Sequence, residues 1–344
     1  MSNAKPILVM DQHFRQVEEL FRPSTFDALQ ETCDVVGAKN WPMPRDAFLE
    51  ALPEADYVVA AQPQMDRAEL DQAPNLKAVI EVSGTFQMGL DYEACFERGI
   101  EVLSCSPGFQ FSVAEMALGL MLAGARGIVE EHERFRNGSE RWLDDRIGSD
   151  FTLFQQTIGF VGYGAIAREI TRLLAPFSPN IVAYDPWLAA SGQTIPGVRF
   201  AELDEVVQTC RTVVVAAMPT EENYHLISAK HIASMQEGAL LLIVSRAHLV
   251  DFDAAVAAAE AGKIRVASDV FPTEPVPKRA AFRTSDNVIW SPHRAAAVEG
   301  GRHPIGDMIV DDIAAIQDGR PERRLLPASP DTVRKIIRAP LAAS

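Results

Sequence analysis

The sequence predicts an α/β protein with two doubly wound parallel-sheet domains, and three observations support this fold class. The chain has 344 residues, about two domains at ~150 residues each. Its composition, 47% apolar and 23% charged, is that of a soluble globular protein. Short apolar runs alternate with longer helical patterns along the whole chain, which is the rhythm of βαβ units.

Two series of elements follow one another. The first has expected strands at 6–10, 57–60, 77–82 and 100–103, with helical patterns at 14–20, 45–52 and 90–98. The second has expected strands at 157–161, 181–184, 212–217, 238–244, 264–270 and 288–290. Nearly continuous apolar runs such as 240–244 are typical of parallel strands buried on both faces.

Two breaks divide the chain. Ser106-Pro107-Gly108 ends the first series, and Ser112 and Glu115 have the spacing of a capping box that opens a long apolar helix. The second break is Ser291-Pro292, after which the chain is mostly helical, over 305–317, with no sheet of its own. We therefore expect one discontinuous domain, 1–106 with 292–344, and an inserted domain, 107–291.

Charge and cysteine content exclude several classes of protein. The net charge is 32 − 47 = −15, and such a surface repels phosphate backbones, so we expect no nucleic-acid partner. The best apolar stretch, 116–125, is far short of the ~20 residues of a membrane span, and the N-terminus lacks a secretory pattern. The four cysteines form no CxxC pair, which favours reduced thiols and a cytoplasmic protein. No histidine has metal-ligand spacing, so no metal is expected.

The strongest local signal is a glycine loop after the strand at 157–161. It reads Gly162-Tyr163-Gly164-Ala165-Ile166-Ala167, and a helical pattern follows. Gly162 permits the tight turn, Gly164 lets a pyrophosphate approach the backbone, and the helix N-terminus offers free N–H groups. Asp185 ends the next strand, 185 − 164 = 21 residues on, where an acid accepts the ribose hydroxyls. The alternative is a plain βαβ turn with a surface Asp. The context favours a dinucleotide site, for NAD rather than NADP.

Four more polar residues follow strands of the same series. Arg246 follows the strand at 238–244, Asp269 and Glu274 end or follow the strand at 264–270, and His293 follows the strand at 288–290. If these strands are parallel, all four residues lie at the carboxyl edge of the sheet, together with the glycine loop. Open α/β sheets bind their ligands at this edge.

This set has a chemical logic for hydride transfer. A hydride that moves between a carbinol carbon and nicotinamide must be matched by a proton on the oxygen, and His293 suits that proton near neutral pH. Glu274 would orient the imidazole, and Arg246 would bind a substrate carboxylate and polarise the carbonyl. Taken singly, the arginine is more typical of a surface ion pair, the histidine of a loop residue and the glutamate of a rigid turn. Their shared edge favours the functional interpretation.

With these residues in view, the chain resembles the D-2-hydroxyacid dehydrogenases, the NAD-dependent group that includes phosphoglycerate, glycerate and D-lactate dehydrogenases. The resemblance runs from about residue 77 to 319. The matching segments are Leu76-Lys77-Ala78-Val79-Ile80, Gly99-Ile100-Glu101-Val102, Pro107-Gly108, Ser112-Val113-Ala114-Glu115, Gly162-Tyr163-Gly164, Tyr184-Asp185-Pro186, Ser245-Arg246, Asp269-Val270-Phe271-x-x-Glu274-Pro275 and Ser291-Pro292-His293.

The resemblance implies a Rossmann NAD domain at 107–291, inserted into a flavodoxin-like substrate-binding domain, and a homodimer formed by the helices after Ser112. It implies that His293 is the acid/base, that Glu274 orients it, that Arg246 binds the substrate, and that Asp269 contacts the nicotinamide amide. Further cofactor contacts are expected from Tyr163, Ala165, Ile166, Met218, Pro219, Val244, Ser245, Ala295 and Ala296.

The chain departs from the family at the loop that binds the substrate carboxylate. The family often has Gly-x-Gly-x-Asp there, whereas this chain reads Ser83-Gly84-Thr85-Phe86-Gln87-Met88-Gly89-Leu90-Asp91. Ser83, Gly84 and Thr85 are expected to bind substrate, the last two through backbone N–H groups. Phe86 and Met88 are expected to make the pocket bulkier or more apolar. Ala247 and Arg294 also replace a usual glycine and a usual apolar residue, and we expect Arg294 to face solvent.

We therefore expect an NAD-dependent enzyme that interconverts a 2-oxo acid and its D-2-hydroxy acid. The alternative is an NAD(H)-sensing corepressor-like binding protein on the same fold, because such relatives keep Arg246, Glu274 and His293. Formate dehydrogenase, a third relative, lacks the acid beside its histidine, so Glu274 argues against it. The departures disfavour phosphoglycerate as substrate more than they disfavour hydride transfer.

Overall fold

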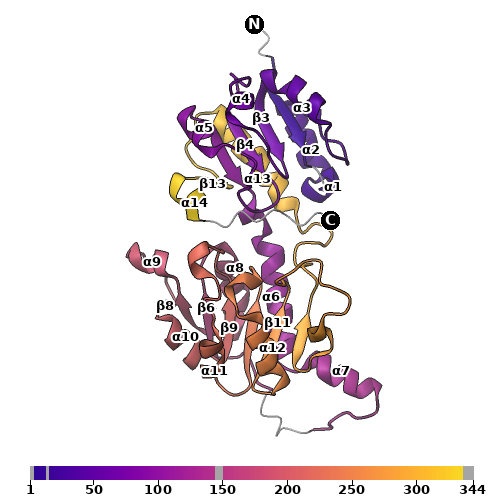
Figure 1. The fold of residues 1–344 in the computed structure, drawn as a ribbon, viewed down its shortest axis with the longest axis vertical. Coiled ribbons are helices and arrows are strands. Elements are labelled where there is room, and N and C mark those ends of the chain that lie inside the picture. The colour runs from indigo at the N-terminus through magenta and orange to yellow at the C-terminus, as the bar shows by residue number, and fades with distance from the viewer. Residues whose placement is uncertain (1–3, 13–14, 144–149, 336–344) are drawn as a thin grey trace. The chain divides into compact units, whose positions relative to one another are not determined.

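The computed structural model describes residues 4–12, 15–143 and 150–335. The chain forms two units: Met1–Gln110 together with Ala296–Ser344, and Phe111–Ala295. We call them unit 1 and unit 2 and describe each by itself (Figure 1). The divisions between the units lie four residues beyond the expected breaks, after Gln110 rather than 106 and after Ala295 rather than 291.

Unit 1 is built on a six-stranded sheet with the order β13-β5-β4-β3-β1-β2. All pairs are parallel except β13 with β5. The run β2-β1-β3-β4-β5 is the flavodoxin-like order. The strands are β1 (Ile7–Asp11), β2 (Asp34–Gly37), β3 (Ala55–Ala60), β4 (Ala78–Glu81), β5 (Glu101–Ser104) and β13 (Leu326–Pro327).

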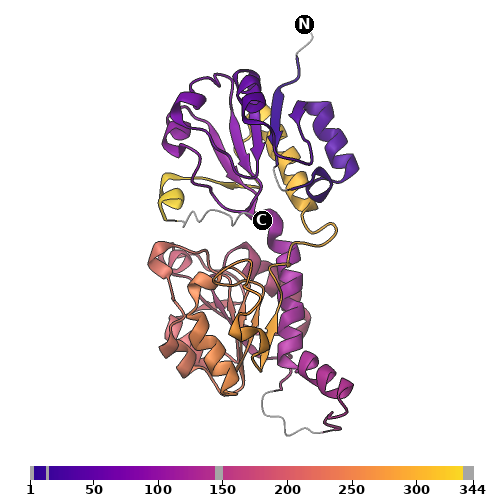
Figure 2. The same cartoon turned by 45° about the vertical axis from the view of Figure 1, so that its right-hand side comes forward.

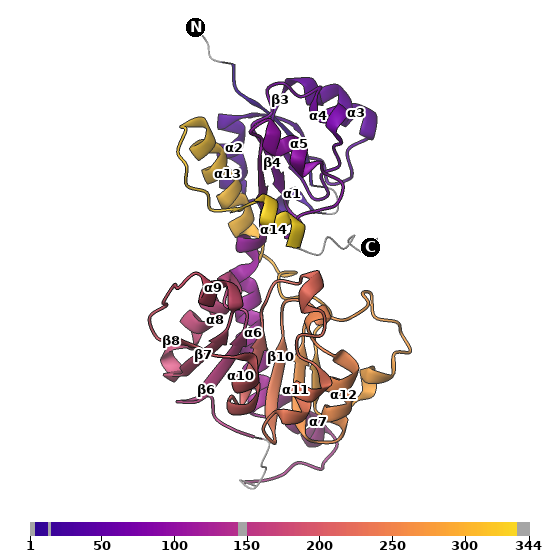
Figure 3. The ribbon, with the colours of Figure 1, turned by 60° about the vertical axis from the view of Figure 1, so that its left-hand side comes forward.

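Helices cover both faces of this sheet. In Figure 3, α2 and α13 lie on one face, and α4 and α5 lie on the other. Leu8, Tyr57, Ile80 and Ile309 are fully buried between the sheet and the α2/α13 layer. The helices of unit 1 are α1 (Val17–Leu20), α2 (Pro23–Thr32), α3 (Arg45–Ala51), α4 (Arg67–Leu70), α5 (Tyr92–Glu97), α13 (His303–Gln317) and α14 (Pro330–Lys335), with 3-10 turns at Leu52–Glu54 and Ser106–Phe109.

Unit 2 is built on a seven-stranded, wholly parallel sheet with the order β12-β11-β10-β9-β6-β7-β8. Strand order reverses between β6 and β9, which is the switch point of the Rossmann fold. The strands are β6 (Thr157–Val161), β7 (Asn180–Tyr184), β8 (Val198–Phe200), β9 (Thr212–Val215), β10 (Ala239–Ile243), β11 (Ile264–Ser268) and β12 (Val288–Trp290).

Helices also cover both faces of the second sheet. Gly124 of α6 lies against Leu240 of β10 on one face, and Val206 of α10 lies against Gly159 of β6 on the other. Figure 3 shows α10, α11 and α12 together on that second face. The helices of unit 2 are α6 (Gln110–Ala125), α7 (Ile128–Arg136), α8 (Ala165–Leu174), α9 (Pro186–Ala190), α10 (Leu203–Thr209), α11 (Ala229–Ser234) and α12 (Phe252–Glu260), with 3-10 turns at Ala175–Phe177, Glu221–Asn223, Ala247–Leu249 and Ala281–Thr284.

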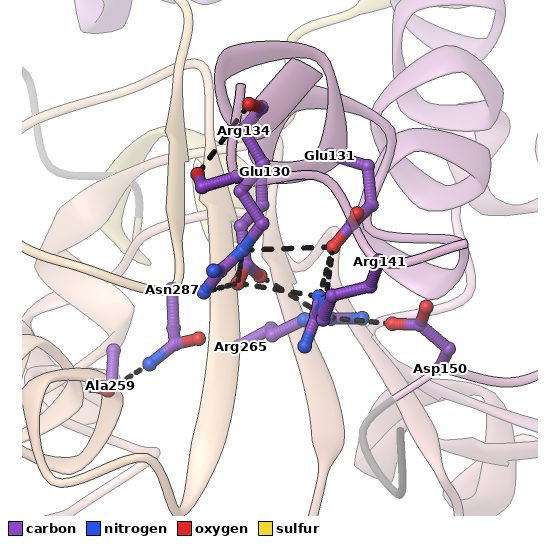
Figure 4. A network of polar contacts seen from close by, with 9 residues as sticks. Glu130, Glu131, Arg134, Arg141, Asp150, Ala259, Arg265 and Asn287 are labelled. Atoms are coloured by element: carbon purple, nitrogen blue, oxygen red, sulfur yellow. Dashed lines mark hydrogen bonds and ion pairs between the residues drawn. The ribbon is translucent and has the colours of Figure 1, made fainter. Parts of the chain in front are cut away.

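Helix α7 extends away from the body of unit 2 (Figure 2) and is anchored by a buried arginine. Arg265 of β11 has a side chain only 6% exposed. It donates to the carbonyl of Gly124 at 2.8 Å and pairs with Asp150 at 2.7 Å and with Glu130 of α7 at 3.5 Å. Figure 4 shows Arg134 and Arg141 joined to Glu130 as well, so the base of α7 belongs to one network of charges.

The prediction of two parallel-sheet α/β domains is confirmed. Three short strands were not predicted, β2, β8 and β13. A charged residue, Asp34 or Arg199, leaves only two or three apolar or small residues in β2 and β8, and β13 has only two residues. Of the helix expected at 14–20, the structure has Val17–Leu20, and Phe14 lies outside the described residues. From Ala296 on, the chain belongs to unit 1, where α13 packs against α2 and β13 extends the sheet.

The expected start of the long apolar helix was wrong. Helix α6 begins at Gln110, directly after the 3-10 turn Ser106–Phe109, so Ser112 lies inside the helix. Its hydroxyl donates to the carbonyl of Ala295 at 2.5 Å and does not cap the helix. By length and composition, the described residues contain one helical stretch that could cross a membrane, Ser106–Ala125, and half of it is buried within the protein. A core helix of a globular domain has the same properties.

Candidate active site

The predicted catalytic residues all lie in unit 2, on loops that leave the carboxyl ends of neighbouring strands. Arg246 follows β10, Glu274 follows β11, and His293 follows β12. These three strands are adjacent and parallel. The glycine loop leaves β6 at the same edge of the sheet.

Glu274 and His293 form a direct pair. His293 Nδ1 lies 2.5 Å from Glu274 Oε2, and Glu274 Oε1 accepts the backbone N–H of Phe271 at 2.8 Å. Burial acts to raise the pKa of Glu274, but the hydrogen bond and charge of His293, the N–H of Phe271 and the charge of Arg246 together bring it below its usual value. The carboxylate is therefore held ionised, with one oxygen fixed by the backbone and the other on the imidazole.

Arg246 lies close enough to Glu274 for its charge to contribute to the lowered pKa of that carboxyl. Its backbone is extended, and its Nη1 donates to the carbonyl of Ser245 at 2.8 Å. Half-buried, it directly precedes the 3-10 turn Ala247–Leu249. The guanidinium, the carboxylate and the imidazole are thus brought to one region of unit 2.

Asp269 fixes the loop that carries His293. This carboxylate is 2% exposed. Its Oδ1 accepts the hydroxyl of Ser291 at 2.5 Å and the N–H of Arg294 at 2.8 Å, and its Oδ2 accepts the N–H of Ala295 at 3.0 Å. His293 has a positive φ of 52°, a conformation that needs support from its surroundings. Asp269 provides that support on both sides of the histidine.

The glycine loop has the conformation that a pyrophosphate requires. Gly162 has φ +86°, and a Cβ there would lie 2.3 Å from the Cα of Ala217. Beside Gly164 a Cβ would meet nothing within 4 Å, so this backbone is open on that side. Gly164 precedes the ten-residue helix α8, and no side chain caps its first N–H groups. Ala165 and Ile166 open that helix and contribute those N–H groups. The residues fit a dinucleotide phosphate.

Asp185 stands at the end of β7, as expected, and it also binds the protein itself. Its Oδ2 accepts the N–H of Tyr163 at 2.8 Å, and its Oδ1 accepts those of Trp187 at 3.2 Å and Leu188 at 3.0 Å. Asp185 thereby caps α9 and fixes the glycine loop. A carboxylate has about four acceptor positions, so these bonds leave capacity for a ribose hydroxyl.

The remaining expected cofactor contacts surround the same edge. Met218 and Pro219 follow β9 and are half-buried, and the Met218 carbonyl accepts Asn223 Nδ2 at 2.8 Å. Val244 and Ser245 extend β10 and are 5% and 8% exposed. Ala295 belongs to unit 2, whereas Ala296 begins the second segment of unit 1.

The expected substrate loop lies in unit 1, at the carboxyl edge of its sheet. A buried acid accepts hydrogen bonds from the interior side of this loop. Glu81, the last residue of β4, is 1% exposed. Its Oε1 accepts both the N–H and the hydroxyl of Ser83, and the N–H of Gly84 at 2.5 Å. The sequence predicted the backbone N–H groups of Gly84 and Thr85 as ligands for a substrate carboxylate. In the structure they point to Glu81, and Thr85 N–H also stabilises this carboxylate.

The expectation for Phe86 was wrong. Phe86 is 1% exposed and packs edge-on against Tyr92 with ring centroids 6.1 Å apart, so it fills the interior of unit 1 and does not line a pocket. Met88 is 69% exposed, and Arg294 is also exposed. The sequence analysis overlooked Glu81. Its one signal was an acid at the end of the apolar run Ala78-Val79-Ile80.

Elsewhere in unit 1, a cavity of about 1030 Å³ lies between α1, α2 and the segments 38–41 and 297–303. It contains none of the predicted site residues. Within residues 4–12, 15–143 and 150–335, no three His, Cys, Asp or Glu side chains gather in a way that would hold a metal ion. His13 lies outside the described residues.

Comparison with known proteins gives the same class of protein as the fold and the glycine loop, an NAD-binding oxidoreductase. Residues 118–295 match the family model "D-isomer specific 2-hydroxyacid dehydrogenase, NAD binding domain". The chain is 31% identical over 300 residues to a glyoxylate reductase of Thermofilum pendens, which covers 85% of this chain and 87% of the relative. It is 31% identical over 278 residues to a D-3-phosphoglycerate dehydrogenase of Methanocaldococcus jannaschii, and this match covers 80% of the chain.

The solved structure of a phosphoglycerate oxidoreductase from Rhizobium etli is also similar, with 32% identity and a TM-score of 0.83 over 94% of this chain and 99% of that one. The chain spans about half the length of the archaeal phosphoglycerate dehydrogenase, 52%. The chain belongs to the D-2-hydroxyacid dehydrogenase family. The predictions of this family, of an enzyme of this family and of NAD as its cofactor are confirmed.

Proposed function

We propose that the protein interconverts a small 2-oxo acid and its D-2-hydroxy acid, with NAD as the hydride carrier. The observation that carries this proposal is the contact of 2.5 Å between His293 Nδ1 and Glu274 Oε2, at the same sheet edge as the glycine loop and Arg246. A proton donor, an acid that orients it and a carboxylate-binding cation suit a 2-oxo acid and its alcohol. Relatives named glyoxylate reductase and hydroxypyruvate reductase support a small substrate.

Each side chain has a separate task in this reaction. Nicotinamide, when bound, supplies or accepts the hydride at the substrate carbon. Because Glu274 holds Nδ1 of His293, the other ring nitrogen, Nε2, is left to give its proton to the carbonyl oxygen during reduction, or to take it from the hydroxyl during oxidation. Arg246 binds the substrate carboxylate and stabilises the negative charge that develops on the oxygen.

The proposed cofactor contacts other than Ala296 lie in unit 2, and the proposed substrate loop lies in unit 1. Gly162, Gly164 and the first N–H groups of α8 suit the pyrophosphate, and Asp185 suits the ribose. Ser83 and Thr85 belong to the loop proposed to face the substrate. The four cysteines are free and buried, which supports a reducing, cytoplasmic location.

We further propose a homodimer, formed by α6, α7 and the segment that follows them. This part of unit 2 carries large apolar side chains that are unusually exposed for a single chain. They are Phe111, Ile128, Val129, Phe135 and Trp142, from 38% to 75% exposed. The acidic surface, with a net charge of −15, gives no support to a nucleic-acid partner, and we propose no membrane partner.

Replacement of Arg246 by glutamine tests the proposed reaction. The change removes charge-assisted bonds of about 1.5–3 kcal/mol each and a stabilising charge of about 3–4 kcal/mol, so we expect kcat/KM with the best 2-oxo acid to fall by about 10³ to 10⁴. NADH binding, followed by fluorescence, stays within about twofold. The matched control is Arg172→Gln, an exposed arginine of the same unit that pairs with Glu169.

A substrate panel distinguishes an enzyme from the alternative, a corepressor-like NAD(H) sensor. A panel of glyoxylate, hydroxypyruvate, pyruvate and bulkier 2-oxo acids is assayed by loss of NADH absorbance. Wild-type protein that binds NADH but reduces none of them would favour a corepressor-like sensor. Matches to relatives named reductases and dehydrogenases support the enzyme instead. Loss of NADH binding in Arg246→Gln would contradict the role given to this arginine.

A further inference from the structure

The geometry points to Glu81 as a positioning residue of the substrate loop, so that the shape of the loop depends on an acid inside the protein and not on the substrate. This inference rests on the proposed function, because it assigns the loop of residues 83–85 to the substrate. Glu81 itself is 1% exposed, so its carboxylate is not accessible to a substrate in solution. It acts only through the residues that it holds.

The carboxylate of Glu81 is unusually well supplied with donors. Oε1 accepts the N–H and hydroxyl of Ser83 and the N–H of Gly84, and Oε2 accepts the hydroxyl of Ser104 at 2.7 Å. A buried carboxylate is tolerated only with such compensation. Burial still raises the pKa of Glu81, to about 7, against the effect of these donors. The titratable groups nearby are Arg15 and the thiol of Cys105, on the segments after β1 and β5; burial raises the pKa of this thiol, which is therefore neutral.

The bonds continue outward from Glu81 through the loop. Gln87 Nε2 donates to the hydroxyl of Ser83 at 2.7 Å, and the hydroxyl of Tyr92 donates to the carbonyl of Gln87 at 2.8 Å. The Phe86 ring packs against Tyr92. Hydrogen bonds to interior groups therefore hold Ser83, Gly84 and Gln87, and this chain of bonds begins at the carboxylate of Glu81.

Gly84 shows that the loop has little freedom to adjust. Its φ is +98°, and a Cβ at this position would lie 2.7 Å from the ring of Phe109. The ring of Phe109 lies against Gly84. The N–H groups of Ser83 and Gly84 donate to Glu81 and therefore face the interior of unit 1. We infer that these inward N–H groups set the position of the loop and do not themselves bind the substrate carboxylate.

Two substitutions at position 81 separate shape from charge. Gln keeps an oxygen for the three donors on Oε1 and offers an N–H to Ser104, so Glu81→Gln keeps KM for the 2-oxo acid within about threefold of wild type. Leu leaves four donors without an acceptor, so Glu81→Leu raises this KM by about tenfold or more. KM for NADH stays within about twofold in both, because the cofactor contacts lie in unit 2.

The matched control is Asp312→Asn. Asp312 is a buried carboxylate of unit 1, 1% exposed, that accepts the N–H groups of Arg324 and Leu325 at 2.8 and 2.9 Å. Its loss lowers the melting temperature without a change in KM for the 2-oxo acid. An equal rise of KM in Asp312→Asn and Glu81→Leu would overturn the inference, because general destabilisation would then explain both. So would a folded Glu81→Leu with the KM of wild type.

Hydrogen exchange of the loop amides gives a readout that needs no activity. In the wild-type protein we expect the N–H groups of Ser83 and Gly84 to be protected, and in Glu81→Leu to exchange at least about tenfold faster. If Glu81→Leu does not fold, Ser104→Ala removes one partner of the carboxylate on the interior side and is expected to raise KM by about fivefold, beyond the range set for Glu81→Gln. Unprotected amides in wild type overturn the inference even if no 2-oxo acid is turned over. A failure of turnover with protected amides contradicts only the proposed function.

Discussion

Replacement of Glu274 by glutamine should move the pH dependence of catalysis, because it removes a negative charge 2.5 Å from Nδ1 of His293. Two unit charges at contact distance interact with about 4 kcal/mol at an effective dielectric constant of 20. The two side chains are 48% and 32% exposed, however, and pairs in water are worth about 1 kcal/mol or less. A value of about 1–2 kcal/mol lies between these limits and corresponds to about one pH unit.

The direction of the change follows from the charge. The carboxylate favours the imidazole that carries a second proton, so its loss makes the His293–Glu274 pair release that proton at a lower pH. In reduction, the limb along which kcat/KM falls with rising pH moves down by about one unit. In oxidation, the limb along which kcat/KM falls with acidity moves down as well. Because the pKa of Glu274 is below its usual value, the pair is lost only when the pH falls through that lowered pKa.

Initial rates of NADH oxidation from pH 5 to 9, at several concentrations of the best 2-oxo acid, measure this shift. The control is Glu205→Gln, which also removes a paired carboxylate: Glu205 pairs with Arg199 of β8 at 2.7 Å. Strand β8 lies at the opposite edge of the sheet from β12. Its pH profile should match that of wild type. If Glu274→Gln folds, binds NADH and has both limbs of its pH profile at the wild-type positions, the proposed effect of the Glu274 carboxylate on proton transfer by His293 is refuted.

Two further predictions concern stability and cofactor binding. Arg265→Met removes a guanidinium that is 6% exposed and leaves Asp150, which is 25% exposed, partly able to reach water; we expect a loss of about 2–4 kcal/mol in urea unfolding, and a loss below about 0.5 kcal/mol would contradict the role of the network. Gly162→Ala places a Cβ 2.3 Å from the Cα of Ala217; we expect NADH to bind at least about tenfold more weakly, with unchanged affinity as the contrary result.

The strands of unit 2 other than β8 were predicted from sequence because they are largely apolar runs. The strand at Val288–Trp290 was predicted with its observed bounds, as was Thr157–Val161. The edge strand β8 was missed because its three residues are half-buried or exposed and alternate too briefly to show a period. Strand β13 has two residues, and only its pairing with β5 defines it.

That the proposed catalytic residues lie at one edge of the sheet was predictable from position alone. Residues that follow parallel strands gather at one edge, and this rule brings Glu274 and His293 together although 293 − 274 = 19 residues separate them. The interior contacts of the loops were not predictable in this way. Nothing in the sequence indicates that Ser83 and Gly84 turn their N–H groups to Glu81, because that depends on the backbone conformation of a short loop.

In both units a buried carboxylate holds a loop at the carboxyl edge of the sheet. A site at the end of a parallel sheet is built from loops, and loops have few internal hydrogen bonds to hold them. In unit 1 the buried carboxylate of Glu81 gathers the N–H groups of Ser83 and Gly84. In unit 2 the buried carboxylate of Asp269 gathers those of Arg294 and Ala295. Each acid ends or directly follows a fully buried strand, so in each unit the end of a buried strand holds a loop in position.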